Sequence, residues 1–169
     1  QIVVKRLHRQ LAEQIEEAAK LETYAEALHE LAMLDPLTGL HNRRYAEERL
    51  VAEVSRSHRC GHPLTVVLLD LNDFKQVNDR YGHVVGDEAL RHVAHVLEQA
   101  FRPDDALFRW GGDEFLVIAP GMDFDGAQRR ITAFRAELAR PGEGAPPVAV
   151  SAGIAILPPG GEPEGALRE

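Results

Sequence analysis

The stretch Arg109-Trp110-Gly111-Gly112-Asp113-Glu114-Phe115, followed by Leu116-Val117-Ile118-Ala119, places two carboxylates directly behind a pair of glycines. Apolar segments lie on both sides, and Gly-Gly between such segments is a turn signal that tolerates positive φ. We therefore expect a β-hairpin with Asp113 and Glu114 at its tip. Taken alone, the motif also fits an ordinary hairpin whose exposed end is polar.

A third carboxylate, Asp70, directly follows the apolar run Leu64-Thr65-Val66-Val67-Leu68-Leu69. Such a run is typical of a strand that is buried on both faces of a sheet. Two strands that end in acids, at Asp70 and Asp113, offer oxygen ligands for Mg²⁺ and leave positions for water and substrate phosphates. Residues 74–87 are a turn-rich stretch before the next helix, which suits nucleotide recognition.

Five motifs with compatible spacing then appear in order between Asp35 and about Leu157. They are Asp35-Pro36-Leu37-Thr38-Gly39-Leu40-His41-Asn42-Arg43-Arg44, Asp70-Leu71-Asn72-Asp73-Phe74-Lys75, Asn78-Asp79-Arg80-Tyr81-Gly82-His83, Gly86-Asp87 and Gly111-Gly112-Asp113-Glu114-Phe115. Together they resemble the GGDEF domain of bacterial diguanylate cyclases, and five motifs are far more specific than one. The resemblance implies an α/β (α+β) fold of the palm-like, ferredoxin-related type, with a helix-flanked sheet that contains antiparallel strands.

The resemblance also implies which residues perform the chemistry. Asp70 and Asp113, with the backbone carbonyl of Leu71, are the implied ligands of Mg²⁺ (or Mn²⁺). The implied catalytic residues are Asp70, Asp113 and Glu114. Whether Asp113 or Glu114 helps to deprotonate the attacking 3′-hydroxyl group stays open.

Substrate recognition is implied for residues of the central motifs. Lys75 matches a phosphate-binding lysine, and Asn78 and Asp87 match residues that read guanine, which favours GTP over ATP because a carboxylate left unpaired by the wrong base is costly. The remaining implied substrate-binding residues are Phe74, Gly111 and Gly112. Without the motif, Lys75 is a surface lysine, Asn78 a cap or turn residue, and Asp87 an acid in the first turn of a helix.

The segment Arg102-Pro103-Asp104-Asp105 lies nine residues before the first glycine of the expected hairpin. It matches the family's RxxD inhibitory site, where an arginine fork grips a guanine edge or a phosphate and the acid accepts from the base. Arg102 and Asp105 are therefore implied to bind cyclic di-GMP as product and inhibitor. The alternative is a loop between a helix and an edge strand, with both side chains solvated.

Residues 1–34 contain no Gly or Pro and are expected to form one long helix. A seven-residue repeat runs through them, with one seam position at Val4, Leu11, Ala18, Ala25 and Ala32 and the other at Leu7, Gln14, Leu21 and Leu28. This pattern favours a parallel coiled coil that signals to, and dimerises, a domain at 35–169. The alternative is an amphipathic helix packed on its own domain. Asp35-Pro36 should end the helix.

Beyond Pro36 the pattern predicts helices and strands in alternation. The expected helices span about 42–58, 86–101 and 123–139, and the expected strands span 64–70, 105–110, 114–119 and 147–156. Residues 141–147 are expected to form a loop.

Composition limits the class of protein. The chain has 169 residues, of which 44% are hydrophobic, and no segment approaches a membrane span, so we expect a soluble cytoplasmic piece. A single cysteine excludes an internal disulfide. The formal charge of −8 argues against nucleic-acid binding. Because the first residue is not Met, we expect a fragment of a longer protein with an upstream sensor, which could be membrane-attached.

Two features depart from the family pattern. Asn72 stands where a second acid is usual, which could weaken metal affinity. Family members normally continue into a helix whose lysine, with a following arginine, contacts phosphates, whereas this sequence ends at Glu169. The sequence therefore predicts a homodimeric diguanylate cyclase that converts two GTP into cyclic di-GMP and two pyrophosphates. The alternatives are a catalytically impaired GTP or cyclic di-GMP binding module and a purely structural dimerisation element.

Overall fold

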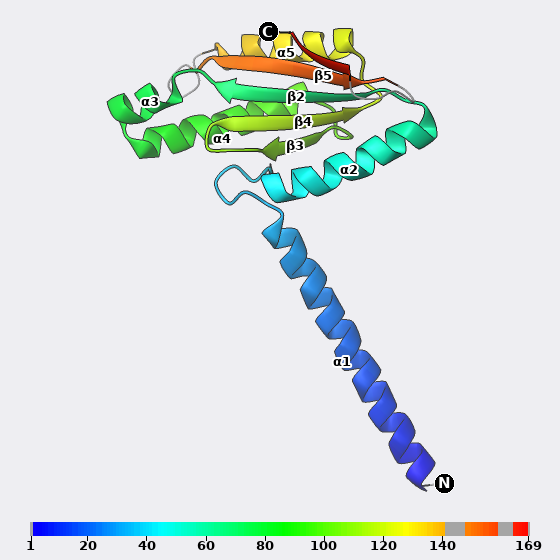
Figure 1. The fold of residues 1–169 in the computed structure, drawn as a ribbon. Helices are drawn as coiled ribbons and strands as arrows, with labels where there is room; N and C mark the ends of the chain where they lie inside the picture. The colour runs from blue at the N-terminus through cyan, green and yellow to red at the C-terminus, as the bar shows by residue number, and fades with distance from the viewer. Residues whose placement is uncertain (1, 141–147, 159–163, 169) are drawn as a thin grey trace. The chain divides into compact units, whose positions relative to one another are not determined.

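A computed structural model describes residues 2–140, 148–158 and 164–168 of the chain. They fall into two compact units, residues 1–34 and residues 35–169 (Figure 1). The loop expected at 141–147 lies outside the described residues. Within the described part, no helix combines the length and apolar character needed to cross a membrane.

The first unit is the long helix that the sequence predicts, α1 (Ile2–Ala32). Ion pairs one turn apart, such as Arg9–Glu13, support it on its polar side. Three of its seam residues expose more than half of their surface, with exposed fractions of 54% for Leu11, 63% for Leu21 and 67% for Leu28. Such an uncovered apolar stripe is what a helix needs in order to pair with another helix.

The second unit is built on a six-stranded sheet. Its strands are β1 (His41–Asn42), β2 (Leu64–Leu71), β3 (Ala106–Arg109), β4 (Glu114–Pro120), β5 (Val150–Leu157) and β6 (Glu164–Arg168), in the order β1-β3-β4-β2-β5-β6. Only β1 and β3 pair in parallel, and the other neighbours are antiparallel. The four strands predicted from the sequence are present. β1 and β6 were not predicted, and two residues such as those of β1 are too few to show a periodicity.

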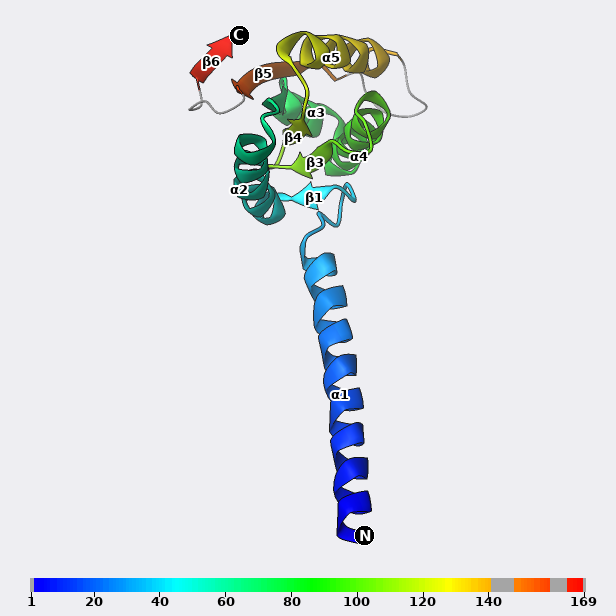
Figure 2. The ribbon, with the colours of Figure 1, turned by 90° about the vertical axis from the view of Figure 1, so that its right-hand side faces the viewer.

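Four helices accompany the sheet, namely α2 (Arg43–Cys60), α3 (Phe74–Tyr81), α4 (His83–Ala100) and α5 (Phe124–Leu138). α2 covers one face of the sheet, and α4 and α5 cover the other (Figure 2). Local signals set the ends of α2: the side chain of Asn42 accepts a hydrogen bond from the backbone N–H of Tyr45 at 3.2 Å, and Gly61 ends the helix with φ 66°.

Alternation along β2 divides the core into two clusters. Val67 and Leu69 point toward α4 and α5 and belong to the larger cluster. Leu64 and Val66 point to the opposite face and pack with Ala46 of α2. Successive strand residues point to opposite faces, so Asp70 shares its face with Leu64 and Val66.

The prediction of a turn-rich stretch after Asp70 was wrong. Residues 74–81 form the helix α3, and α4 begins at His83, three residues earlier than expected. Phe74 and Val77 lie on one side of α3 and pack against the larger core cluster. The polar residues between them conceal this short apolar face in the sequence, although the three-residue spacing is helical.

Candidate active site

The carboxylates of the two strand ends meet across the β2–β4 pair. Asp70 and Glu114 are direct partners in the antiparallel register, and the backbone N–H of Leu71 donates to the carbonyl of Asp113 at 3.1 Å. The expectation that Asp113 ends a strand needs correction, because Asp113 lies in the turn and Glu114 begins β4. Three carboxylates nevertheless gather at one end of this strand pair.

This end of the sheet is open on the face that α2 covers elsewhere. By alternation, Asp70 lies on the face of Leu68, and Glu114 lies on the face of Leu116. Leu68 is 39% exposed although it lies in a central strand. Asp70 is exposed, and Asp113 and Glu114 are half-buried. A ligand can therefore reach these acids from solvent without moving a helix.

The hairpin turn is closed by its own backbone. The N–H groups of Trp110 and Gly111 both donate to the carbonyl of Glu114, at 2.8 and 3.2 Å. Neither Gly111 nor Gly112 adopts the positive φ that glycine would tolerate. A Cβ on Gly111 would overlap Oε2 of Glu114, so a side chain there would require this carboxylate to move. Gly111 therefore leaves room for the Glu114 carboxylate beside the turn.

An ion pair that was not predicted from the sequence helps to hold the same turn. Arg109 donates through Nη1 to Asp35 Oδ1 at 3.1 Å and through Nη2 to the carbonyl of Gly112 at 2.7 Å. Asp35 also accepts from the N–H and the hydroxyl of Thr38, at 2.9 and 2.7 Å. The two partners are 74 positions apart, so only their presence in separate motifs hinted at a shared role.

These contacts decide the ionisation of Asp35. Burial of its carboxyl group opposes ionisation, but the hydrogen bonds from Thr38 and the guanidinium of Arg109 outweigh burial and hold the pKa below its ordinary value. Asp35 is thus an ionised anchor for Arg109, which in turn holds the turn that contains Asp113.

The acids at the open end differ from Asp35 in having no cation beside them. Within the described residues, Asp70, Asp113 and Glu114 form no ion pair, and no cluster of three His, Cys, Asp or Glu side chains is close enough to enclose a metal ion. Negative charge without a protein counterion attracts cations. Any metal held here would need further ligands from water or from a bound phosphate.

The residues matched to substrate recognition lie on α3 and α4. Lys75 is exposed near the start of α3, which begins three residues after β2 ends. Asn78 is half-buried in the last turn of α3, and Asp87 is half-buried in α4. The alternative that placed Asp87 in the first turn of a helix is wrong, because α4 starts four residues before it.

Arg102 and Asp105 come together in the turn before β3. Oδ2 of Asp105 accepts from the N–H of Arg102 at 2.9 Å, and Asp105 is only 7% exposed, so the alternative of two solvated side chains is wrong for the acid. Arg102 itself is exposed. This turn precedes Ala106, at the opposite end of β3 from the glycines. The turn of Arg102 and Asp105 is therefore distinct from the glycine turn that carries the acids.

Comparison with known proteins gives the family. Residues 32–169 match the sequence profile described as "Diguanylate cyclase, GGDEF domain". The chain belongs to this family.

Named relatives agree with this assignment. The GGDEF chain is 37% identical over 124 residues to the diguanylate cyclase DgcP of Pseudomonas aeruginosa, and 47% identical over 91 residues to the response regulator PleD of Caulobacter vibrioides. These matches cover 73% and 54% of the chain but only 18% and 20% of the relatives. The chain therefore corresponds to about a fifth of the length of these two proteins.

A solved structure resembles both units of the GGDEF chain. It is the coiled coil and GGDEF domain of DgcB from Caulobacter crescentus in complex with c-di-GMP, with a TM-score of 0.79 and 28% identity. The match covers 91% of this chain and 84% of the chain in that structure. A relative of known structure thus shares the same order along the chain, a long helix followed by a helix-flanked sheet.

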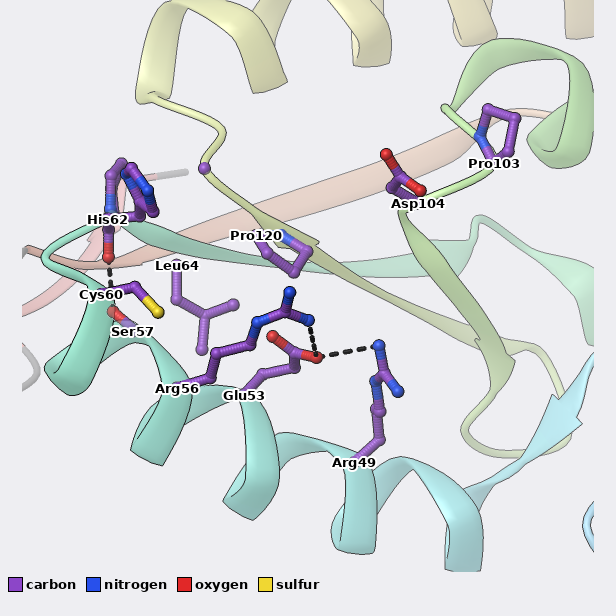
Figure 3. A pocket seen from close by; sticks show the side chains of 12 residues that line it. Arg49, Glu53, Arg56, Ser57, Cys60, His62, Leu64, Pro103, Asp104 and Pro120 are labelled. Carbon is purple, nitrogen blue, oxygen red and sulfur yellow. Dashed lines mark hydrogen bonds and ion pairs between the residues drawn. The ribbon is translucent and has the colours of Figure 1, made fainter.

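The GGDEF domain also has a cavity of about 550 Å³ away from the three acids (Figure 3). Leu64 and Pro120, which line it, are register partners at the far end of the β2–β4 pair from Asp70 and Glu114. At about 3.4 Å per residue, roughly 20 Å of strand separates the two places. Pro103 and Asp104 of the RxxD turn border this cavity, so it lies beside the candidate inhibitory site.

Proposed function

We propose that this GGDEF domain condenses two GTP into cyclic di-GMP and two pyrophosphates at the interface of a homodimer. The observation that carries the proposal is the meeting of Asp70 with Asp113 and Glu114 at an open sheet end, where none of them forms an ion pair with the described residues. An acidic site binds a triphosphate only through a metal and local basic residues. Family membership supplies the reaction, and this geometry supports it.

The donor set fits Mg²⁺ or Mn²⁺, because carboxylate oxygens of Asp70 and Asp113 and the carbonyl of Leu71 are hard ligands. When bound, such an ion neutralises charge that develops on the phosphates during displacement. The side chains of Asp70 and Asp113 would hold this ion at the end of the sheet, where the phosphates of GTP could reach it. Either Asp113 or Glu114 accepts the proton of the attacking 3′-hydroxyl.

The neighbouring helices are proposed to bind the rest of the nucleotide. Lys75 supplies a positive charge to the phosphates, with Phe74 and the glycines of the turn shaping the site. Asn78 and Asp87 read the edge of guanine. A carboxylate in this place accepts from two hydrogens of guanine that adenine lacks, which selects GTP.

Dimerisation is proposed to run through α1, whose exposed Leu11, Leu21 and Leu28 form a stripe along one side. Pairing of two α1 helices would bring two half-sites together, so that each 3′-hydroxyl attacks the partner's α-phosphorus. Holding the two reactants in line supplies much of the acceleration. The signal would come from a sensor upstream of α1, with the catalytic domain in the cytoplasm.

Product inhibition is proposed at Arg102 and Asp105. The exposed Arg102 guanidinium, the nearly buried Asp105 and the adjoining cavity support a binding site for cyclic di-GMP there. Because this turn lies at the other end of β3 from the acids, the product would act at a distance from the chemistry.

The decisive experiment is chromatography of the nucleotides after incubation of the chain with GTP and Mg²⁺. The parent is expected to make cyclic di-GMP and Asp113→Ala is not, which excludes a contaminating cyclase. If neither makes product but GTP raises the melting temperature, the domain is a nucleotide-binding module instead. If GTP has no effect on melting, a structural dimerisation element remains.

Dimerisation has its own test. Leu21→Lys should shift the chain to monomer in sedimentation and abolish turnover, whereas Glu22→Lys, one residue off the seam, should leave both unchanged. A monomeric Leu21→Lys variant with full activity would exclude the dimeric mechanism.

Inhibition is tested by adding cyclic di-GMP to initial-rate assays. Arg102→Ala should raise the concentration needed for half inhibition at least tenfold, and Arg91→Ala, exposed on α4, should not. Equal inhibition of the parent and Arg102→Ala would contradict the assignment.

A further inference from the structure

Two glycines shape the junction between α3 and α4. Gly82 is the only residue between these helices and has φ 86° and ψ 161°, a conformation that is essentially restricted to glycine. Its N–H donates to the carbonyl of Asn78 at 2.9 Å, and its carbonyl accepts from the N–H of Gly86 at 3.2 Å. The chain therefore reverses within one residue and brings the first turn of α4 against α3.

The second glycine, Gly86, is the point where α3 touches α4. It is buried, and a Cβ placed on it would overlap Oδ1 of Asn78. The same Cβ would lie 3.0 Å from Cγ of Asn78 and 3.3 Å from Cζ of Phe74. A methyl group at residue 86 therefore needs the space that the amide of Asn78 occupies.

Glycine inside a helix is otherwise unfavourable, because it loses more backbone freedom than alanine and contributes no side chain to packing. The structure offers a reason for it at this position, namely room for Asn78. Residue 87, the next along α4, is the acid matched to guanine recognition. The separation between Asn78 and Asp87 is thus set by how closely α3 approaches Gly86.

We propose that Gly86 is a positioning residue for base recognition. Its missing side chain lets the Asn78 amide lie where it can read guanine together with Asp87, and any larger residue displaces that amide. The inference rests on the proposed function of Asn78 and Asp87 and extends it to a residue that touches no substrate. A displaced amide weakens nucleotide binding more than it slows the chemical step, because the acids at the sheet end are untouched.

The test is a double-mutant cycle of Gly86→Ala and Asn78→Ala. For each variant we would titrate a non-hydrolysable GTP analogue with Mg²⁺ and measure KM and kcat with GTP. Gly86→Ala is expected to weaken binding and raise KM at least tenfold while kcat changes less than threefold. In the Asn78→Ala background, Gly86→Ala should cause no further loss. Val84→Ala, 74% exposed on the same helix, is the matched control and should bind like the parent.

The outcomes separate this inference from the proposed function. Asn78→Ala with parental binding would refute the role of Asn78 itself. Weakened binding in Asn78→Ala but parental binding in Gly86→Ala would overturn only the inference about Gly86. An equal loss from Gly86→Ala in both backgrounds would also overturn it, because the methyl group would then act without Asn78.

Thermal unfolding covers the case in which Gly86→Ala does not fold. If adding Asn78→Ala to Gly86→Ala restores folding, the methyl group at residue 86 and the Asn78 amide compete for the same space, as the inference requires. If the double variant also fails to fold, the methyl group conflicts with something other than Asn78, and the inference is wrong.

Discussion

The carboxylates at the two ends of the β2–β4 pair differ in burial and in ion pairing. At one end, Asp70 and Glu114 face each other across the ladder and form no ion pair with any described side chain. At the other end, Glu53 of α2 is 3% exposed and Oε1 lies 2.8 Å from Nη2 of Arg49 (Figure 3). A buried charge must be paired, whereas acids at an open edge can remain unpaired until a ligand brings positive charge. The difference separates a paired acid within the fold from solvent-accessible acids that we propose bind a ligand.

The largest expected effect comes from neutralising an open-end acid. Asp70→Asn or Asp113→Asn should lower the initial rate of cyclic di-GMP formation by at least about a hundredfold. The melting temperature should stay the same or rise, because one of three neighbouring negative charges is removed. A variant with parental turnover and a lowered melting temperature would show that these acids are structural.

The opposite pattern is expected at the buried end. Glu53→Gln should lower the free energy of unfolding by about 2 kcal/mol, since Arg49 loses its partner but remains partly solvated. Urea unfolding gives this value, and the turnover of the folded fraction should be unchanged. Glu48→Gln in the same helix, whose partner Arg44 is exposed and 3.7 Å away, is the control and should cost almost nothing. Equal losses in the free energy of unfolding from Glu53→Gln and Glu48→Gln would show that the buried ion pair stabilises the fold no more than the exposed one.

Arg109→Ala tests a residue that links the two kinds of acid. Arg109 forms an ion pair with Asp35 and also holds the turn next to the open-end acids. The substitution should cost about 1 kcal/mol of stability through the lost bonds to Asp35 and Gly112, and turnover should fall severalfold. Arg44→Ala, a solvated pair on α2, is the control for removing an arginine. Unchanged turnover in Arg109→Ala would show that the turn keeps its shape without this brace.

The smallest effect is the acid dependence of stability. The pKa of Asp35 is lowered in the folded chain, so its ionised form stabilises the fold above the pKa of the unfolded chain, near 4. This contribution is lost as the pH falls through the folded pKa. Urea midpoints measured between pH 6 and pH 3 should fall more steeply for the parent than for Asp35→Asn. Parallel curves would show that the Asp35 pair adds no pH-dependent stability.

Much of the fold could be predicted from patterns within short segments. The β2 run, the hairpin around Gly111 and the long helix α1 each carry their own periodicity or turn signal, and the structure has all three. The helix α3 escaped prediction because its apolar face consists of little more than Phe74 and Val77. Its helical state depends on the core beneath it, a tertiary contact that local propensity does not record.

The candidate site could likewise be predicted only in part. Motif matching could name Asp70, Asp113 and Glu114, whereas the strand pattern placed Asp113 at a strand end although it lies in the turn before β4. Antiparallel register decides that Glu114 opposes Asp70. The ion pair between Asp35 and Arg109 could not be predicted either, because contact between residues 74 positions apart depends on the tertiary fold.

The sequence by itself determined the family, the types of the main elements and which acids are candidates for the site, because these depend on residue identity and short-range spacing. The tertiary structure alone decided which acids face one another, which described acids are paired with cations and that Gly86 lies against Asn78. Those properties depend on register and on the distance between chain segments far apart in sequence. They arise only when the sheet forms and α3 closes against α4.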